Sequence, residues 1–200
     1  MNTIFFLLLI FAYLMGSIPF GYLIPKMRGI DIRTIGSKAT SSTNVSRALG
    51  WRWGIVNIVL DVSKSYIPVA MALRYLSNPW EAVVVALMPV AGHVFPVWLN
   101  FKGGKGGAPF YGALIAFIGI SSPLVLLGLA FFIAILAVFK RTSVANLSLP
   151  WILAVLIFSI KQDIPLTVYS ILGAIIITIA LRENIKRLMQ RTEPKTPFKF

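Results

Sequence analysis

The chain has 200 residues, of which 58% are hydrophobic and only 12% are charged, well below the roughly one quarter that is usual in soluble domains. Its 19 lysines and arginines against 6 acidic residues give a formal net charge of +13. In a soluble protein this charge would suggest a nucleic-acid partner, but beside long apolar segments it indicates the cytoplasmic loops of a membrane protein, and no nucleic acid is expected. The sequence has no cysteine and one histidine, His93, which excludes disulfides, thiolate sites and a histidine cluster, so no metal or cofactor is expected.

Seven apolar segments of the chain are candidates for membrane-spanning helices. About 20 apolar residues cross the ~30 Å hydrocarbon core of a bilayer as a helix. This length predicts spans at 3–25, 53–76, 82–100, 108–120, 123–139, 144–160 and 164–181. The sequence "SSP" at 121–123 is interpreted as a turn between two spans, because proline interrupts the hydrogen bonds of a helix. The predicted fold class is therefore all-α, a polytopic membrane protein of about seven transmembrane helices.

The positions of the basic residues predict how these segments are oriented. No positive charge precedes the first segment and its first cations follow it, the opposite of a cleaved signal peptide, so we expect a permanent first helix with the N-terminus outside. With seven crossings, the inner segments are 26–52, 101–107, 140–143 and 182–200. They hold six, two, two and six cations, which is sixteen of the nineteen in the chain. Six crossings would place the basic tail outside, so the positive-inside rule favours seven crossings and a cytoplasmic C-terminus.

Asp61, Lys64 and His93 are ionisable side chains in the interior of predicted spans. Asp61 and Lys64 are three residues apart, so they share a helix face and can form an ion pair. We prefer a structural role for this pair over a catalytic one. His93 lies about two turns before the inner end of its segment, where histidine either forms hydrogen bonds within the bundle or transfers a proton.

Two inner loops carry groups suited to binding an anion. The stretch "GSKATSSTNVSR" places hydroxyl and amide groups ahead of a helical segment, where they either cap the helix or, together with arginine, bind phosphate. The stretch "NFKGGKGG" at 100–107 combines flexible glycines with lysines, which suggests a bound anion; a basic loop that only sets topology is the alternative. It is not a P-loop or a dinucleotide fingerprint, because Gly106 directly follows Lys105 and Pro109 stands where a third glycine is needed.

The other two polar elements are "FKRTSVANLS" and "LRENIKRLMQRTEPK", which continues the last helix beyond the membrane. In the predicted topology all four polar elements lie on the cytoplasmic side. Because short loops between neighbouring helices cannot extend far, we expect them to build one site at the inner interface.

Several of these stretches resemble the bacterial acyl-phosphate:glycerol-3-phosphate acyltransferase family. In chain order the similar motifs are "GSIPFGYLI", "IGS", "TNVSRALG", "LDVSK", "GHVFPVWLNFKGGKG" and "RENIKRL…TE". The resemblance covers nearly the whole chain, which implies that residues 1–200 form a single integral membrane acyltransferase domain. It further implies an enzyme that transfers an acyl group from acyl phosphate to the 1-hydroxyl of glycerol 3-phosphate, giving lysophosphatidic acid and phosphate. The implied location is the bacterial plasma (inner) membrane, with the active site on the cytoplasmic side.

The resemblance also implies roles for individual residues. The catalytic residues it implies are Ser37, Arg47, His93, Lys105 and Asn184. The substrate-binding residues it implies are Asn44, Lys102, Gly103, Gly104, Gly106, Gly107, Ser143 and Arg182. The backbone N–H groups of residues 103–107 are expected to meet the carbonyl oxygen of the donor as it gains charge.

The chain departs from the family pattern at four places. The loop "KATSS" contains no glycine, Asn146 replaces a second serine, Leu181 stands where histidine is usual, and Pro109 stands where threonine is common. Two other functions therefore stay open: a transporter of an anionic solute, and a catalytically weakened relative that binds lipid phosphate. Formation of product distinguishes an enzyme from a scaffold, and counterflow of a labelled anion in liposomes identifies a transporter. Acyl-chain preference and oligomeric state are not predicted.

The predicted topology can be tested with a reporter fused after Phe200. Because sixteen of nineteen cations fit one side, a reporter that is active only in the cytoplasm should be active in this fusion. Activity of a reporter that functions only in the periplasm would overturn the predicted orientation.

Overall fold

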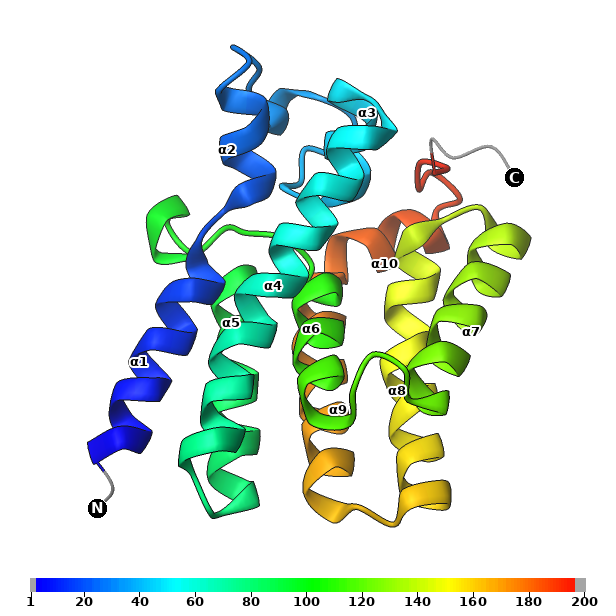
Figure 1. The fold of residues 1–200 in the computed structure, drawn as a ribbon. Helices are drawn as coiled ribbons and strands as arrows, with labels where there is room; N and C mark the ends of the chain where they lie inside the picture. Colours follow the sequence, from blue (N-terminus) through cyan, green and yellow to red (C-terminus); the bar gives the residue numbers. More distant parts are fainter. Residues whose placement is uncertain (1–2, 197–200) are drawn as a thin grey trace.

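The computed structural model describes residues 3–196, and within that range it contains helices and loops but no β-strand (Figure 1). The α-helices are α1 (Thr3–Ser17), α2 (Phe20–Lys26), α3 (Ser42–Leu49), α4 (Trp51–Tyr75), α5 (Pro79–Val94), α6 (Gly107–Ile118), α7 (Pro123–Phe139), α8 (Thr142–Lys161), α9 (Ile164–Ala180) and α10 (Arg182–Met189). Two short 3-10 helices, η1 (Ile32–Thr34) and η2 (Val97–Leu99), lie in the loops. The all-α fold class is confirmed.

A helix forms within each of the seven predicted segments, and α7 has the predicted bounds, 123–139. Four helical stretches of the described chain are long and apolar enough to cross a membrane: Thr3–Lys26, Trp51–Tyr75, Pro79–Leu99 and Thr142–Lys161. The pair α9 and α10, bent by 63°, would make a fifth. Since α6 and α7 are shorter, the number of crossings and the orientation of the termini stay predictions.

The short helices α6 and α7 are separated by the predicted turn. Gly119 has a φ of 81°, a conformation that glycine adopts without strain, and it ends α6. Pro123 occupies the first position of α7, where its missing N–H removes no helical hydrogen bond. The turn therefore follows from local sequence, as the "SSP" element predicts.

The main hydrophobic core lies between α5, α6, α8 and α9. Phe110 and Tyr169 are fully buried, and their rings stack with centroids 5.3 Å apart. The Tyr169 hydroxyl donates a hydrogen bond of 2.9 Å to the Phe110 carbonyl oxygen, which satisfies its polar group inside the core. By contrast, α7 buries only Leu124, Gly128 and Leu136. Most of its apolar surface therefore faces outward, as lipid contact requires.

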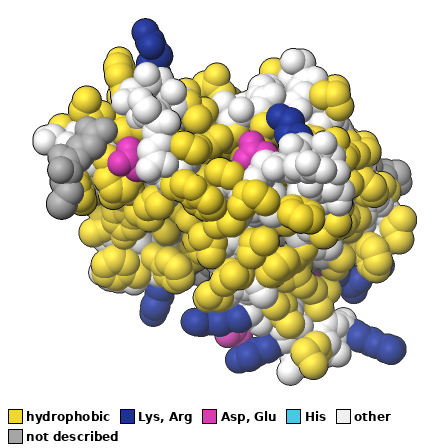
Figure 2. All heavy atoms as spheres, turned by 90° about the horizontal axis from the view of Figure 1, so that it is seen from below, with side chains coloured by type: hydrophobic (Ala, Val, Ile, Leu, Met, Phe, Trp, Pro, Cys, Tyr) yellow, Lys and Arg dark blue, Asp and Glu magenta, His cyan; other side chains and the backbone are white. Residues whose placement is uncertain are grey.

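Hydrophobic side chains cover most of the face shown in Figure 2. The polar segments lie at the other end of the bundle, where Figure 1 shows α2, α3, α10 and the loop that leads into α6. We call this the polar end; it comprises residues 20–50, 97–107, 140–143 and 181–196. The predicted convergence of the four polar elements is thus present in the structure.

The predicted pair of Asp61 and Lys64 forms inside the bundle. Lys64 Nζ lies 2.9 Å from Asp61 Oδ1, and both side chains are almost fully buried. Lys64 Nζ also donates to the carbonyl oxygen of Ile18 at 2.7 Å, so the pair ties α4 to the break between α1 and α2. Asn57 Nδ2 donates to Asp61 Oδ2 at 2.8 Å and to Ser42 Oγ at 2.7 Å, which connects the pair to the start of α3.

Replacing one member of this pair should therefore destabilise the protein more than replacing both. Asp61→Asn or Lys64→Met leaves one buried charge without its partner, and we expect each to lower the free energy of unfolding by about 3–5 kcal/mol. The double variant should recover part of that loss. Thermal unfolding in detergent measures this, and equal losses in the single and double variants would contradict the pairing.

Candidate active site

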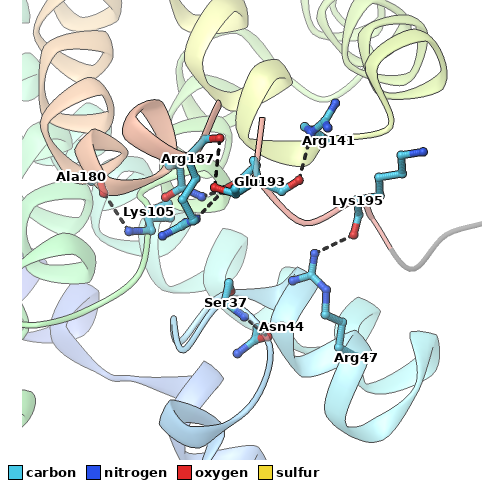
Figure 3. Close-up of polar contacts among 11 residues, drawn as sticks. Ser37, Asn44, Arg47, Lys105, Arg141, Ala180, Arg187, Glu193 and Lys195 are labelled. Carbon is cyan, nitrogen blue, oxygen red and sulfur yellow. Dashed lines mark hydrogen bonds and ion pairs between the residues drawn. The ribbon is translucent and has the colours of Figure 1, made fainter. Parts of the chain in front are cut away.

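The first polar loop is organised around Asn44, which is fully buried in the first turn of α3. Its Nδ2 group donates to three carbonyl oxygens, and its Oδ1 atom accepts from the N–H of Ser37 at 3.2 Å. The three carbonyls belong to Ile32, Ile35 and Ala39. Asn44 thus fixes the loop that carries Ser37 (Figure 3). This arrangement gives Asn44 a positioning role, whereas the resemblance implies direct substrate contact.

Arg47 extends from the last turn of α3 toward the C-terminal segment. Its Nη2 group donates to the carbonyl oxygen of Lys195 at 2.9 Å. Partial burial lowers the pKa of Arg47, and the carboxylate of Glu193 opposes this effect.

Residues 100–107, which we call the glycine loop, pack directly against the C-terminal end of α5. The N–H of Gly103 donates to Val94 O at 3.1 Å, and the N–H of Gly104 donates to His93 O at 2.9 Å. The expectation that all N–H groups of residues 103–107 face substrate is therefore wrong for these two. Gly106 and Gly107 stand at the cap and first position of α6, where N–H groups have no acceptor within the helix.

His93 is held between α4 and the glycine loop. Its Nδ1 atom lies 3.5 Å from Asp61 Oδ1. A Cβ atom at position 104 would overlap His93 Nε2, so only glycine allows the loop to pass this close to the ring. The buried imidazole therefore connects the ion pair of α4 to the glycine loop.

Lys105 points from the glycine loop to the end of α9. Its Nζ donates at 2.8 Å to the carbonyl oxygen of Ala180, the last residue of that helix, where the helix dipole favours a cation. Burial lowers the pKa of Lys105 below its usual value, and the nearby charge of Arg187 lowers it further.

A buried carboxylate, that of Glu193, gathers the C-terminal polar residues. Asn184 Nδ2 donates to Glu193 Oε1 and Arg187 Nε donates to Glu193 Oε2, both at 2.7 Å. Arg141 Nε donates to the backbone oxygen of the same residue at 3.1 Å. Figure 3 shows Arg141, Arg187 and Glu193 in one region with Lys105, Arg47 and Ser37, and Asn184 joins this region through its hydrogen bond to Glu193. We call these seven residues the cationic cluster: Ser37, Arg47, Lys105, Arg141, Asn184, Arg187 and Glu193.

A cavity of about 400 Å³ lies beside the cationic cluster. The polar residues and glycines of its lining include Ser41, Ser42, Thr43, Asp61, His93, Lys105, Gly106, Gly107, Thr142 and Asn146. Its other lining residues are mostly apolar and come largely from α6 and α7; they include Ile115, Ile120, Leu126, Leu129, Phe132 and Leu136. Lys105 belongs to both the cavity wall and the cationic cluster. The arrangement suits an amphiphilic anion whose charged head lies at Lys105 and whose apolar tail lies between α6 and α7.

The remaining predicted residues are distributed unevenly. Ser143 is buried at the start of α8, and its hydroxyl has no hydrogen-bond partner within the described residues. Lys102 is exposed, and Arg182 is 76% exposed and lies 3.8 Å from the carboxylate of its neighbour Glu183. Neither lines the cavity. Lys102 and Arg182 therefore lie outside the cavity wall, although the charge of Arg182 is close enough to Lys105 to contribute to lowering the pKa of that lysine.

Sequence reasoning missed several residues of the site. Glu193 and Arg187 lie within the family-like C-terminal motif, and an isolated acid in a strongly basic tail is a signal that could have identified Glu193. In sequence, Arg141 stands out only as a charge that sets topology. The cavity residues Thr43 and Thr142, whose hydroxyls meet at 3.3 Å between α3 and α8, lie in two of the polar stretches, but nothing in the sequence distinguishes them from the neighbouring hydroxyl residues.

Three departures from the family pattern have local structural explanations. Pro109 is the third residue of α6, a position whose N–H is not needed by the helix. In the loop without glycine, Lys38 takes a left-handed φ of 58°. Leu181 is buried in the core at the bend between α9 and α10, so it contributes packing there and no polar group.

The fold and the site define an integral membrane protein with a cationic site beside an apolar cavity. The sequence matches the family model described as Glycerol-3-phosphate acyltransferase over residues 6–191. The chain belongs to this family.

Curated relatives named glycerol-3-phosphate acyltransferase cover nearly the whole chain. One from Prochlorococcus marinus is 39% identical over 194 residues, which is 94% of this chain and 96% of the relative. One from Geotalea daltonii is 43% identical over 188 residues, 93% of this chain and 94% of the relative.

Solved structures of a relative also share the fold. The glycerol 3-phosphate form of PlsY (YgiH), an integral membrane glycerol 3-phosphate acyltransferase, is similar with a TM-score of 0.89 and 33% identity, covering 96% of this chain and 94% of that one. Its lysophosphatidic acid form gives a TM-score of 0.87 at 32% identity, with the same coverage.

Glu193→Gln should destabilise the polar end. The amide removes the negative charge that Arg187 and Asn184 contact, and we expect the free energy of unfolding to fall by about 1–3 kcal/mol. Glu183→Gln is the matched control, because its carboxylate is 53% exposed and its ion pairs are long; the loss there should stay within about 0.5 kcal/mol. Thermal unfolding in detergent compares the two, and equal losses would show that Glu193 does not hold the cluster.

Proposed function

We propose that this protein transfers an acyl group from acyl phosphate to the 1-hydroxyl of glycerol 3-phosphate, forming lysophosphatidic acid and releasing phosphate. Family membership supports the acyl transfer and the acceptor. The main observation in favour of acyl phosphate as the donor is the position of Lys105, which belongs to both the cationic cluster and the wall of the cavity. A lysine in that position suits a substrate that is both a phosphate and a lipid.

The acyl chain of the donor lies in the cavity between α6 and α7. Its apolar wall removes the chain from water, and burial of each methylene contributes roughly 0.8 kcal/mol. The phosphate of the donor lies at Lys105, near the free N–H groups of Gly106 and Gly107. Those backbone donors then face the carbonyl region of the donor, where negative charge develops during transfer.

The phosphate of glycerol 3-phosphate binds in the cationic cluster. Arg47 suits it because a guanidinium contacts two phosphate oxygens at once. Ser37 and Asn184 supply a hydroxyl and an amide from two other segments, and Asn44 keeps Ser37 in place. In this proposal the acceptor lies next to Lys105 and hence beside the donor.

The transfer requires no covalent enzyme intermediate, because acyl phosphate is already activated. The acceptor oxygen forms a bond to the acyl carbonyl carbon, and the bond between that carbon and the phosphate oxygen breaks. The proton of the hydroxyl passes to an oxygen of a substrate phosphate or to His93, which lines the cavity beside Gly104. Phosphate then leaves through the polar end.

The polar end faces the cytoplasm of a bacterial cell, and the apolar helices lie in its plasma membrane. The positive-inside rule supports this side, because most cations of the chain lie at that end. Both substrates are anions whose charged groups can reach the polar end from water. The transporter alternative gains no support from the family match or from the single-sided arrangement of charges.

Lys105→Gln should reduce acyl transfer by about a hundredfold or more, since a charge-stabilising group in contact with the reacting phosphate is removed. The variant should remain folded in detergent, because glutamine can still donate to the Ala180 carbonyl. Lys161→Gln, at the far end of α8, removes the same charge from an exposed site and should leave the rate unchanged. The measurement is lysophosphatidic acid formed by purified protein from acyl phosphate and glycerol 3-phosphate. Near-normal turnover of folded Lys105→Gln would refute the anion site.

A further inference from the structure

Asn146 is one of the polar residues that line the cavity. It is in the first turns of α8 and lines the cavity with Lys105 and Gly107. The apolar part of the lining comes mainly from α6 and α7. A polar side chain in the wall of a cavity that suits an amphiphile can contact the head group of an occupant, because the tail offers it no hydrogen bond.

The orientation of the Asn146 amide is fixed by two neighbours. Its Nδ2 group donates to the carbonyl oxygen of Thr142 at 2.9 Å, which uses one of its two hydrogens. Its Oδ1 atom lies against Gly107, so closely that a Cβ atom added at position 107 would overlap it. The glycine at the start of α6 thus provides the space that this amide occupies.

The groups around the Asn146 amide favour an anionic ligand. Lys105 lines the same cavity, and α6 begins at Gly107, against which the amide lies; the helix dipole and the N–H groups of the first turn favour negative charge there. The second Nδ2 hydrogen adds a donor to the same region.

We infer that Asn146 is a further substrate-binding residue, which donates from its amide to an oxygen of the acyl phosphate head group. This inference rests on the proposed function, and it states which of the two substrates Asn146 contacts: the acyl phosphate donor, not glycerol 3-phosphate. Gly107 takes part by leaving the space in which the amide lies.

The test separates a substrate contact from a purely structural hydrogen bond. Asn146→Ala should raise the KM for acyl phosphate about tenfold, the effect of one hydrogen bond to a charged group, and leave the KM for glycerol 3-phosphate unchanged. Asn146→Ser keeps a shorter donor and should give a smaller rise. Ser148→Ala is the matched control, because the Ser148 hydroxyl also donates to the carbonyl four residues earlier, at 2.9 Å, but does not line the cavity. It should change neither constant.

Gly107→Ala tests the shared space. In the parent protein the added methyl group displaces the amide and should raise the KM for acyl phosphate as much as Asn146→Ala does. In the Asn146→Ala background it should add little, because no amide remains to be displaced. Fully additive effects, a rise in both KM values alike, or a KM for acyl phosphate within twofold of the parent in folded Asn146→Ala would each overturn the inference.

Failure of the proposed function gives a different result. If the parent protein forms no lysophosphatidic acid, the proposed function fails, and calorimetric titration with a non-hydrolysable acyl phosphonate tests Asn146 by itself. Binding by the parent and Ser148→Ala but about tenfold weaker binding by Asn146→Ala would support the inference. Equal binding by all three, or no binding by the parent, would overturn it.

Discussion

The carboxylate of Glu193 is the contact on which the polar end depends. Arg47, Lys105, Arg141 and Arg187 come from four separate segments and would repel one another at short range. Glu193 accepts from Arg187 and Asn184 with its side chain and from Arg141 with its backbone, and the segment that follows it accepts from Arg47 through Lys195. The buried carboxylate of Glu193 thus offsets the repulsion between these cations, so that they can lie close together at the proposed phosphate site.

The apolar half of the site depends on a different constraint, the shortness of α6 and α7. Both helices end before they reach spanning length, and their connection at 119–122 lies beside the lower part of the cavity. Within α7 few side chains are buried, so the helix stands away from the main core and leaves room beside α6. The cavity can therefore receive a lipid chain without interrupting the packed core around Phe110 and Tyr169.

The glycine loop joins these two halves. Gly104 permits contact with the ring of His93, and Gly107 leaves space for Asn146. In both cases the missing side chain allows close approach of a polar group from another helix, which is a tertiary requirement on a residue that looks merely flexible in sequence. The Asp61 and Lys64 pair supports the other side of His93 from within α4.

The sequence by itself determined which segments are helical and which end of each is polar. Helices follow from the lengths of the apolar runs and from local turn chemistry at Gly119 and Pro123, and these depend only on near neighbours. The family-like motifs also predict that Lys105, Asn184 and Arg47 belong to one site. Lys105 and Arg47 lie in the same region as Glu193 (Figure 3), to which Asn184 is hydrogen-bonded.

Only the tertiary structure decided which polar groups face inward and what they contact. Lys102 and Lys105 are nearly equivalent in sequence, but left-handed backbone at Asn100 and Phe101 turns the loop, Lys102 is exposed, and Lys105 reaches the end of α9. The roles of Glu193 and Asn146 likewise depend on partners distant in sequence, Arg141 and Gly107. Such contacts arise from the packing of whole helices, and no local pattern of residues records them.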